Sequence, residues 1–156
     1  MGLARSRLAL QAPLQFIVSL PVQLGQTAHL VLGPLAYAGV ALATAGIAFE
    51  TIGDWQLARF RADAANAGKV LANGLWRYTR HPNYFGDPCV WLGLYLIAAD
   101  AGHAAWSLPG PVLMTYLLTS LSGVPTLEGH LKRNRPGYGD YVRRTSGFIP
   151  LPPKKA

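Results

Sequence analysis

Charged residues are scarce in this 156-residue chain, and acidic residues are the scarcest of them. Only 13% of the residues are charged, against the roughly 25% usual in a soluble domain, whereas 51% are hydrophobic. Seven Asp and Glu residues are set against 14 Lys and Arg, which gives a formal net charge of +7. The length allows one domain. This composition argues against an ordinary soluble domain and indicates a membrane protein.

Several motifs are also missing. Cys89 is the single cysteine, so the chain can form no internal disulfide, and Cys89 is interpreted as a small buried apolar residue. There is no Gly-x-Gly-x-x-Gly after a strand, no Walker loop and no nucleophile elbow. His29, His103 and His130 have no companions at metal-ligand spacing, so no metal site is expected. Any cofactor is therefore bound by something other than a Rossmann or P-loop fold.

Long apolar runs are what the chain does contain. Four stretches approach the roughly 20 apolar residues that a spanning helix needs, namely residues 8–24, 30–52, 84–99 and 104–124. The second and fourth are long enough, whereas the first is broken by prolines and the third is short and carries Asp87. The second is rich in Ala and Gly, which lets membrane helices approach closely. The predicted fold is therefore all-α: a polytopic membrane domain over residues 1–156, with about four spans.

The positions of the basic residues support this count. With four spans, all 14 fall on one side: Arg5, Arg7, Arg59, Arg61, Lys69, Arg77, Arg80, Lys132, Arg133, Arg135, Arg143, Arg144, Lys154 and Lys155. Cytoplasmic loops collect Lys and Arg, so both termini are expected in the cytoplasm, and the positive charge needs no nucleic-acid partner. The N-terminal run also fits a secretory signal, but it has no good small-residue cleavage site.

The loop before the third stretch concentrates basic side chains. Pro82 is suited to the first turn of a helix, so the segment delivers Arg77, Arg80 and His81 to a helix N-terminus, with Asn83 beside them. Free N–H groups and guanidinium groups together favour an anion there. The alternative is that these residues only mark topology and bind anionic lipid head groups.

A second basic segment follows the fourth stretch, where a short amphipathic helix is expected. Arg143 and Arg144 come after Tyr138 and Tyr141, which are spaced for stacking or hydrogen bonding with a nucleotide-like cofactor.

Three acids, Glu50, Asp87 and Glu128, lie within or at the edge of a span. Ionisable groups at that depth are costly and mark a functional or pairing role. The alternative is that they only neutralise Arg77, Arg80 or Arg133.

Three ordered segments are similar to a known family. Residues 74–87 read GLWRYTRHPNYFGD, residues 46–60 contain Gly46, Glu50 and DWQL, and the tail contains RPGYGDY and GFIP. Together they resemble the steroid 5-alpha-reductase-like membrane family, and more closely its bacterial branch. The Arg-His-Pro-x-Tyr core and the Tyr-x-x-Tyr tail also resemble the related isoprenylcysteine carboxyl methyltransferases.

The resemblance implies an all-helical membrane fold with a cofactor cavity open to the cytoplasm, in a bacterial inner membrane. The cofactor would be NADPH in a reductase or S-adenosylmethionine in a methyltransferase. With Arg77 from the basic loop, the candidate cofactor-binding residues are Asp54, Arg77, Arg80, His81, Asn83, Tyr84, Asp87, Tyr138, Tyr141, Arg143 and Arg144. Glu128 would contact the amine of S-adenosylmethionine. The proton donor would be His81 or a nearby tyrosine, Tyr84.

Members of this family carry further spans before the region matched here, so this chain is expected to lack them. Three functions stay open. The first is an NADPH-dependent reductase of a carbon–carbon double bond conjugated to a carbonyl in a lipid-like substrate, such as a steroid or isoprenoid. The second is a membrane methyltransferase, and the third is a truncated, non-catalytic member. A homo-oligomer is a further expectation, because a chain without the family's other helices has reason to associate.

Overall fold

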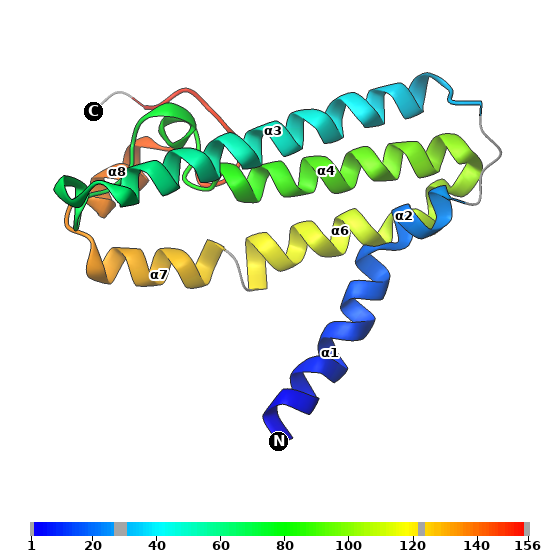
Figure 1. Cartoon of the computed structure of the whole chain (residues 1–156), viewed down its shortest axis with the longest axis horizontal. Helices are drawn as coiled ribbons and strands as arrows, with labels where there is room; N and C mark the ends of the chain where they lie inside the picture. The colour runs from blue at the N-terminus through cyan, green and yellow to red at the C-terminus, as the bar shows by residue number, and fades with distance from the viewer. Residues whose placement is uncertain (1, 27–30, 122–123, 155–156) are drawn as a thin grey trace. The chain divides into compact units, whose positions relative to one another are not determined.

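The computed structural model describes residues 2–26, 31–121 and 124–154, and its regular structure in those ranges is helical (Figure 1). The α-helices are α1 (Gly2–Val18), α2 (Leu20–Gly25), α3 (Pro34–Ala62), α4 (Pro82–Ala98), α5 (Ala104–Ser107), α6 (Pro109–Tyr116), α7 (Val124–Asn134) and α8 (Tyr138–Arg144). Short turns of tighter or wider helix are η1 (Ala64–Asn66), η2 (Gly74–Arg77), η3 (Ala99–His103) and η4 (Leu117–Leu121). The predicted all-α class and the short C-terminal helix are confirmed.

Helix α3 is long and apolar enough to cross a membrane. It has 29 residues, which corresponds to about 43 Å, and it is the one helix in the described ranges that meets both criteria. The other predicted spans are shorter or interrupted. The first is divided at Ser19 between α1 and α2, α4 has 17 residues, and Pro109 begins a new helix within the fourth. One span therefore has structural support, and the count of four stays a prediction.

The chain forms two compact units, and α3 and α4 each contribute to both. Unit 1 contains Met1–Thr44 and Val90–Tyr116, and unit 2 contains Ala45–Cys89 and Leu117–Ala156. Charge is divided very unevenly between them. The charged residues of unit 1 are Arg5, Arg7 and Asp100, and every other Lys, Arg, Asp and Glu belongs to unit 2. A charged ligand would therefore find its partners in unit 2.

Unit 1 exposes large apolar side chains. Phe16, Val31, Tyr37 and Trp106 are 60, 92, 65 and 76% exposed. Such a surface would promote aggregation in water but suits contact with lipid. Asp100, the one acidic residue of unit 1, accepts a hydrogen bond within the unit. The Gly33 N–H donates to Asp100 Oδ2 at 2.7 Å, which satisfies a backbone donor at the start of α3.

Glycines bring α3 and α4 into backbone contact. In unit 1, a Cβ atom on Gly93 would lie 2.5 Å from the Gly39 carbonyl oxygen. In unit 2, a Cβ atom on Gly86 would lie 2.6 Å from the Gly46 carbonyl oxygen and 2.9 Å from the Glu50 nitrogen. These distances leave no room for a side chain, which confirms the close approach predicted from the small residues of α3.

A valine at position 86 should therefore force the two helices apart. We expect Gly86→Val to lower the free energy of unfolding by about 1–3 kcal/mol, because both nearest atoms belong to the backbone of α3. Thermal unfolding in detergent measures this. Gly129→Ala in α7 is the control, since its Cβ would meet nothing closer than 3.8 Å, and it should be neutral or stabilising. Equal unfolding temperatures for Gly86→Val and the wild type would contradict the close approach.

Candidate functional site

The loop between α3 and α4 is held against the end of α3. Trp76 donates from Nε1 to the Gly53 carbonyl at 3.0 Å, and the Leu75 N–H donates to Gln56 Oε1 at 3.0 Å. Gly74 has φ +57°, a backbone conformation that favours glycine. A Cβ atom at this position would also lie only 2.5 Å from the Gln56 side chain. The C-terminal part of α3 thus fixes the start of the basic loop.

The C-terminal tail fixes the other end of this loop. Thr79 is fully buried and donates from Oγ1 to the Phe148 carbonyl at 2.8 Å. The Arg80 N–H donates to the Ser146 carbonyl at 2.9 Å, and the Leu151 N–H donates to the Tyr78 carbonyl at 3.0 Å. Residues 78–80 therefore run beside residues 146–151, so the two predicted basic segments meet in unit 2.

Arg80 joins the loop to α7 and α8. Its Nε donates to Glu128 Oε1 at 2.7 Å, and its Nη1 donates to the carbonyls of Thr145 at 2.7 Å and Val142 at 3.2 Å. Those carbonyls belong to the C-terminal end of α8, where a cation is favoured. The same Glu128 oxygen lies 3.1 Å from His81 Nε2. The pairing role considered for Glu128 is confirmed, with Arg80 as its partner.

The protonation of this cluster follows from its environment. Burial lowers the pKa of His81 more than the Glu128 carboxylate raises it. For Glu128, burial would raise the pKa, but the hydrogen bonds from Arg80 and His81 together outweigh it and hold the pKa below its usual value. At neutral pH, His81 is therefore neutral and donates from Nε2 to a charged Glu128, while Arg80 balances that charge.

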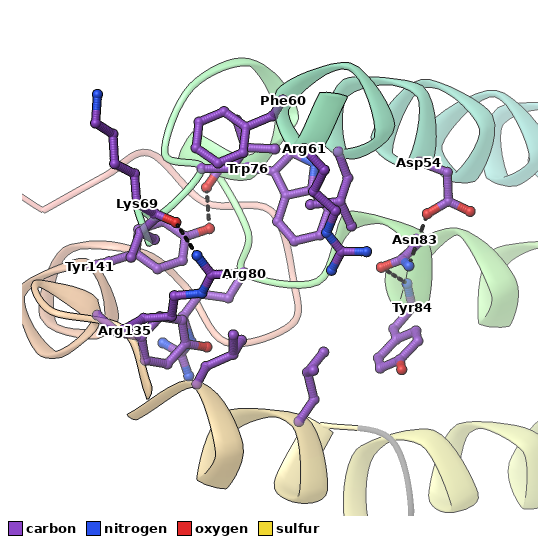
Figure 2. A pocket seen from close by; sticks show the side chains of 16 residues that line it. Asp54, Phe60, Arg61, Lys69, Trp76, Arg80, Asn83, Tyr84, Arg135 and Tyr141 are labelled. Carbon is purple, nitrogen blue, oxygen red and sulfur yellow. Dashed lines mark hydrogen bonds between the residues drawn. The ribbon is translucent and has the colours of Figure 1, made fainter. Parts of the chain in front are cut away.

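Beside this cluster, unit 2 contains a cavity of about 370 Å³, within the size range of small-ligand sites (Figure 2). Its walls are mostly apolar or aromatic: Leu57, Phe60, Val70, Leu71, Trp76, Tyr84, Leu127, Leu131, Tyr138 and Tyr141. The polar lining residues are Asp54, Arg61, Lys69, Arg80, Asn83 and Arg135. Four cations therefore meet one carboxylate in an otherwise apolar space, which favours a ligand with both anionic and apolar parts.

The cavity brings together half of the residues that the sequence predicts. Asp54, Arg80, Asn83, Tyr84, Tyr138 and Tyr141 line it, whereas Arg77, His81, Asp87, Glu128, Arg143 and Arg144 do not. His81 and Glu128 lie directly behind it, because the His81 ring stacks on Tyr84 with the ring centroids 5.5 Å apart. Arg77 and Arg144 are exposed, and Arg143 forms an exposed ion pair with Asp140.

Three lining cations, Arg61, Lys69 and Arg135, were not among the predicted site residues. Arg61 could have been found, because it lies seven residues after Asp54 on one face of α3. Lys69 and Arg135 have no local signal. They line the cavity together because the end of α7 meets the loop after η1, where Arg135 Nη1 donates to the Lys69 carbonyl at 3.5 Å.

Two neighbouring tyrosines of α8 differ in their hydrogen bonding. Tyr141 is buried and donates from its hydroxyl to the Trp76 carbonyl at 2.6 Å. Tyr138 is only 2% exposed, yet its hydroxyl has no hydrogen-bond partner within the part of the chain that the structure describes. Burial raises the pKa of Tyr138 to about 12, so the hydroxyl keeps its proton and can donate to a ligand in the cavity.

The two tyrosines should therefore respond differently to loss of the hydroxyl. Tyr141→Phe leaves the buried Trp76 carbonyl without its donor, and we expect a loss of about 1–3 kcal/mol in unfolding free energy. Tyr138→Phe removes a buried hydroxyl that has no protein partner. Its unfolding free energy should therefore lie within about 0.5 kcal/mol of the wild-type value, or above that value. Chemical denaturation in detergent compares the pair. Equal losses would show that both hydroxyls are structural.

The Glu128 cluster predicts a signed pH dependence. Glu128→Gln keeps an acceptor for Arg80 but removes the charge, so stability at pH 7 should fall by roughly 1.5–3 kcal/mol. Because the pKa values of Glu128 and His81 are lowered in the fold, the wild type loses stability as pH falls, first near the usual histidine pKa and then below the usual glutamate pKa. The wild type and the variant should therefore converge in acid.

Unfolding measured from pH 7 to well below the usual glutamate pKa tests this convergence. The control is Asp140→Asn, which breaks an exposed pair and should change stability by less than about 0.5 kcal/mol at every pH. A gap between wild type and Glu128→Gln that does not narrow as pH falls below the usual glutamate pKa would be inconsistent with a charged Glu128.

Comparison with known proteins finds one matching family and two similar curated proteins. The family described as "Protein of unknown function (DUF1295)" matches residues 5–145. A rat protein named 3-oxo-5-alpha-steroid 4-dehydrogenase 1 is 28% identical over 118 residues, which cover 76% of this chain and 42% of the rat protein. An uncharacterized protein of Schizosaccharomyces pombe is 38% identical over 47 residues, which cover 30% of this chain and 14% of that protein.

The chain thus aligns with less than half the length of either curated relative. No solved structure matches it. The expected resemblance to the steroid 5-alpha-reductase-like family is confirmed by the rat enzyme and by the family match. Because that match covers nearly the whole sequence, the protein belongs to the DUF1295 family.

Proposed function

We propose that this protein is a membrane reductase that uses NADPH to reduce a carbon–carbon double bond conjugated to a carbonyl in a lipid-like substrate. The observation that carries the proposal is the cavity of unit 2, where cations and aromatic rings meet beside the segment that resembles the reductases. The name of the rat relative supports an oxidoreductase acting on a steroid. With the predicted topology, this cavity would open toward the cytoplasm.

The lining of the cavity fits NADPH in chemical terms. Cationic side chains suit its phosphates, and the rings of Trp76 and Tyr84 suit its planar groups. Asn83 is held in place, since its Nδ2 donates to Asp54 Oδ1 at 3.1 Å and its Oδ1 accepts from the Tyr84 N–H at 3.0 Å. Its second amide hydrogen could bind a carboxamide oxygen. When bound there, NADPH would supply the hydride.

Reduction of the double bond also needs a proton, and we assign its donation to Tyr84. Tyr84 lines the cavity, whereas His81 is 1% exposed and does not. The His81 ring lies nearly parallel to that of Tyr84, at 11°, and its Nε2 is held by Glu128. His81 is therefore a positioning residue, and the Tyr84 hydroxyl would give its proton to the substrate carbon next to the carbonyl and recover one from water.

The methyltransferase alternative receives less support from the site. It requires Glu128 to contact the amine of S-adenosylmethionine, but Glu128 does not line the cavity, and its Oε1 already accepts from Arg80 and lies within hydrogen-bond distance of His81. Arg80→Ala would be a poor test of either cofactor, because it also breaks the contacts with α7 and α8.

A sharper test of the reductase uses Tyr84→Phe. The purified protein should oxidise NADPH when supplied with steroid or isoprenoid enones. Tyr84→Phe keeps the ring against His81 but removes the proton, so turnover should fall about 100-fold or more while NADPH affinity stays unchanged. Stopped-flow absorbance and NADPH fluorescence measure the two quantities. Tyr78→Phe, in the same loop but exposed and away from the cavity, should behave as wild type.

Binding titrations separate the remaining functions. Saturable binding of NADPH but not of S-adenosylmethionine supports the reductase. Binding of S-adenosylmethionine alone would identify a methyltransferase and overturn the proposal. If neither cofactor binds to the folded protein, the proposal that this chain is an NADPH-dependent reductase is wrong.

A further inference from the structure

We infer that Arg61, Lys69 and Arg135 form a phosphate-binding end of the cavity and set a preference for NADPH over NADH. This inference rests on the proposed function, because it concerns which nucleotide that same cavity takes. It assigns the phosphate contacts to cations that line the cavity, in place of Arg77, Arg143 and Arg144 of the basic segments, which do not line it.

The charge balance of the cavity is the first support. Arg80 is neutralised by Glu128, and the one acid in the lining, Asp54, accepts a hydrogen bond from Asn83. Among the residues that the structure describes, the ion pairs are Arg80 and His81 with Glu128 and Arg143 with Asp140. None of these pairs contains Arg61, Lys69 or Arg135. Three positive charges therefore line the cavity without an acidic partner.

Geometry is the second support. The three cations come from different segments: Arg61 from the end of α3, Lys69 from the loop after η1, and Arg135 from the residue after α7. Arg135 donates to the Lys69 carbonyl at 3.5 Å, so these two lie together. Figure 2 shows Lys69 and Arg135 on the side of the cavity away from Asp54 and Asn83.

The cavity therefore has two chemically different ends. An elongated ligand would place its anionic groups at the cations and an uncharged, hydrogen-bonding group at Asn83 and Asp54. Like charges brought together repel one another unless an anion lies among them, and guanidinium groups bind phosphate through paired hydrogen bonds. NADPH differs from NADH by one phosphate on the adenine ribose, so a cluster of free cations should favour NADPH strongly.

The test compares two triple variants that each remove three positive charges. The first is Arg61→Gln, Lys69→Gln and Arg135→Gln. The control is Arg59→Gln, Lys132→Gln and Arg133→Gln, which changes exposed residues near the first set that do not line the cavity. The ligands are NADPH, NADH, 2′-phospho-ADP-ribose and inorganic pyrophosphate, each titrated in uncharged detergent. Thermal unfolding shows that both variants fold.

For wild type and control, we expect NADPH to bind at least roughly tenfold more tightly than NADH, with an affinity that falls as salt rises. In the first variant, the ratio of NADPH affinity to NADH affinity should fall close to one. NADPH binding should also depend less on salt, and 2′-phospho-ADP-ribose should bind more weakly. An unchanged preference in the first variant, or equal losses in both variants, would overturn the inference.

Two further outcomes separate this inference from the proposed reaction. If wild type binds 2′-phospho-ADP-ribose through these cations but never oxidises NADPH, the phosphate-binding role is supported and the proposed reductase activity is wrong. A lipid head group could offer the same phosphate chemistry, so the titrations are repeated with added phosphatidylglycerol. If that lipid binds at the three cations and the soluble phosphates do not bind without it, the nucleotide inference is overturned.

Discussion

The structure of unit 2 depends on one carboxylate. Glu128, on α7, accepts a hydrogen bond from Arg80 of the loop and lies within hydrogen-bond distance of His81, at the start of α4. Arg80 in turn holds the carbonyls that end α8. A single acid thus connects three segments that are far apart in the sequence. Because both partners of this ion pair are largely buried, removing either would leave a charge without compensation, which is far more costly than losing a surface pair.

This dependence changes how the Arg-His-Pro segment is understood. Read along the chain, adjacent basic residues before a helix suggest direct contact with an anion. In the structure, Nε and Nη1 of Arg80 bind the protein itself, and His81 is buried behind Tyr84. The segment therefore builds one wall of the cavity and fixes Tyr84 and Asn83 at its edge. Its residues matter to a ligand mainly through the positions they impose.

The sequence predicted the helical fold class, and half of its predicted site residues line the cavity of unit 2. Hydrophobic runs are local signals, so the helical class could be predicted from them, whereas the break at Pro109 was not predicted. Asp54, Asn83 and Tyr84 were predicted because they lie in two of the segments that resemble the family. Lys69 and Arg135 were missed because their role depends on a contact between residues 66 positions apart, which no local pattern encodes.

The division of charge explains why such a site can exist in a chain this short. Unit 1 has three charged residues and exposes apolar side chains, so it contributes little to binding polar ligands. Unit 2 concentrates the remaining charge, and one acid there neutralises the one arginine that must be buried. Within the described part of the chain, the other lining cations, Arg61, Lys69 and Arg135, then have no acidic partner. A chain with more acids would satisfy those cations internally, and its cavity would lose the positive potential that an anionic ligand requires.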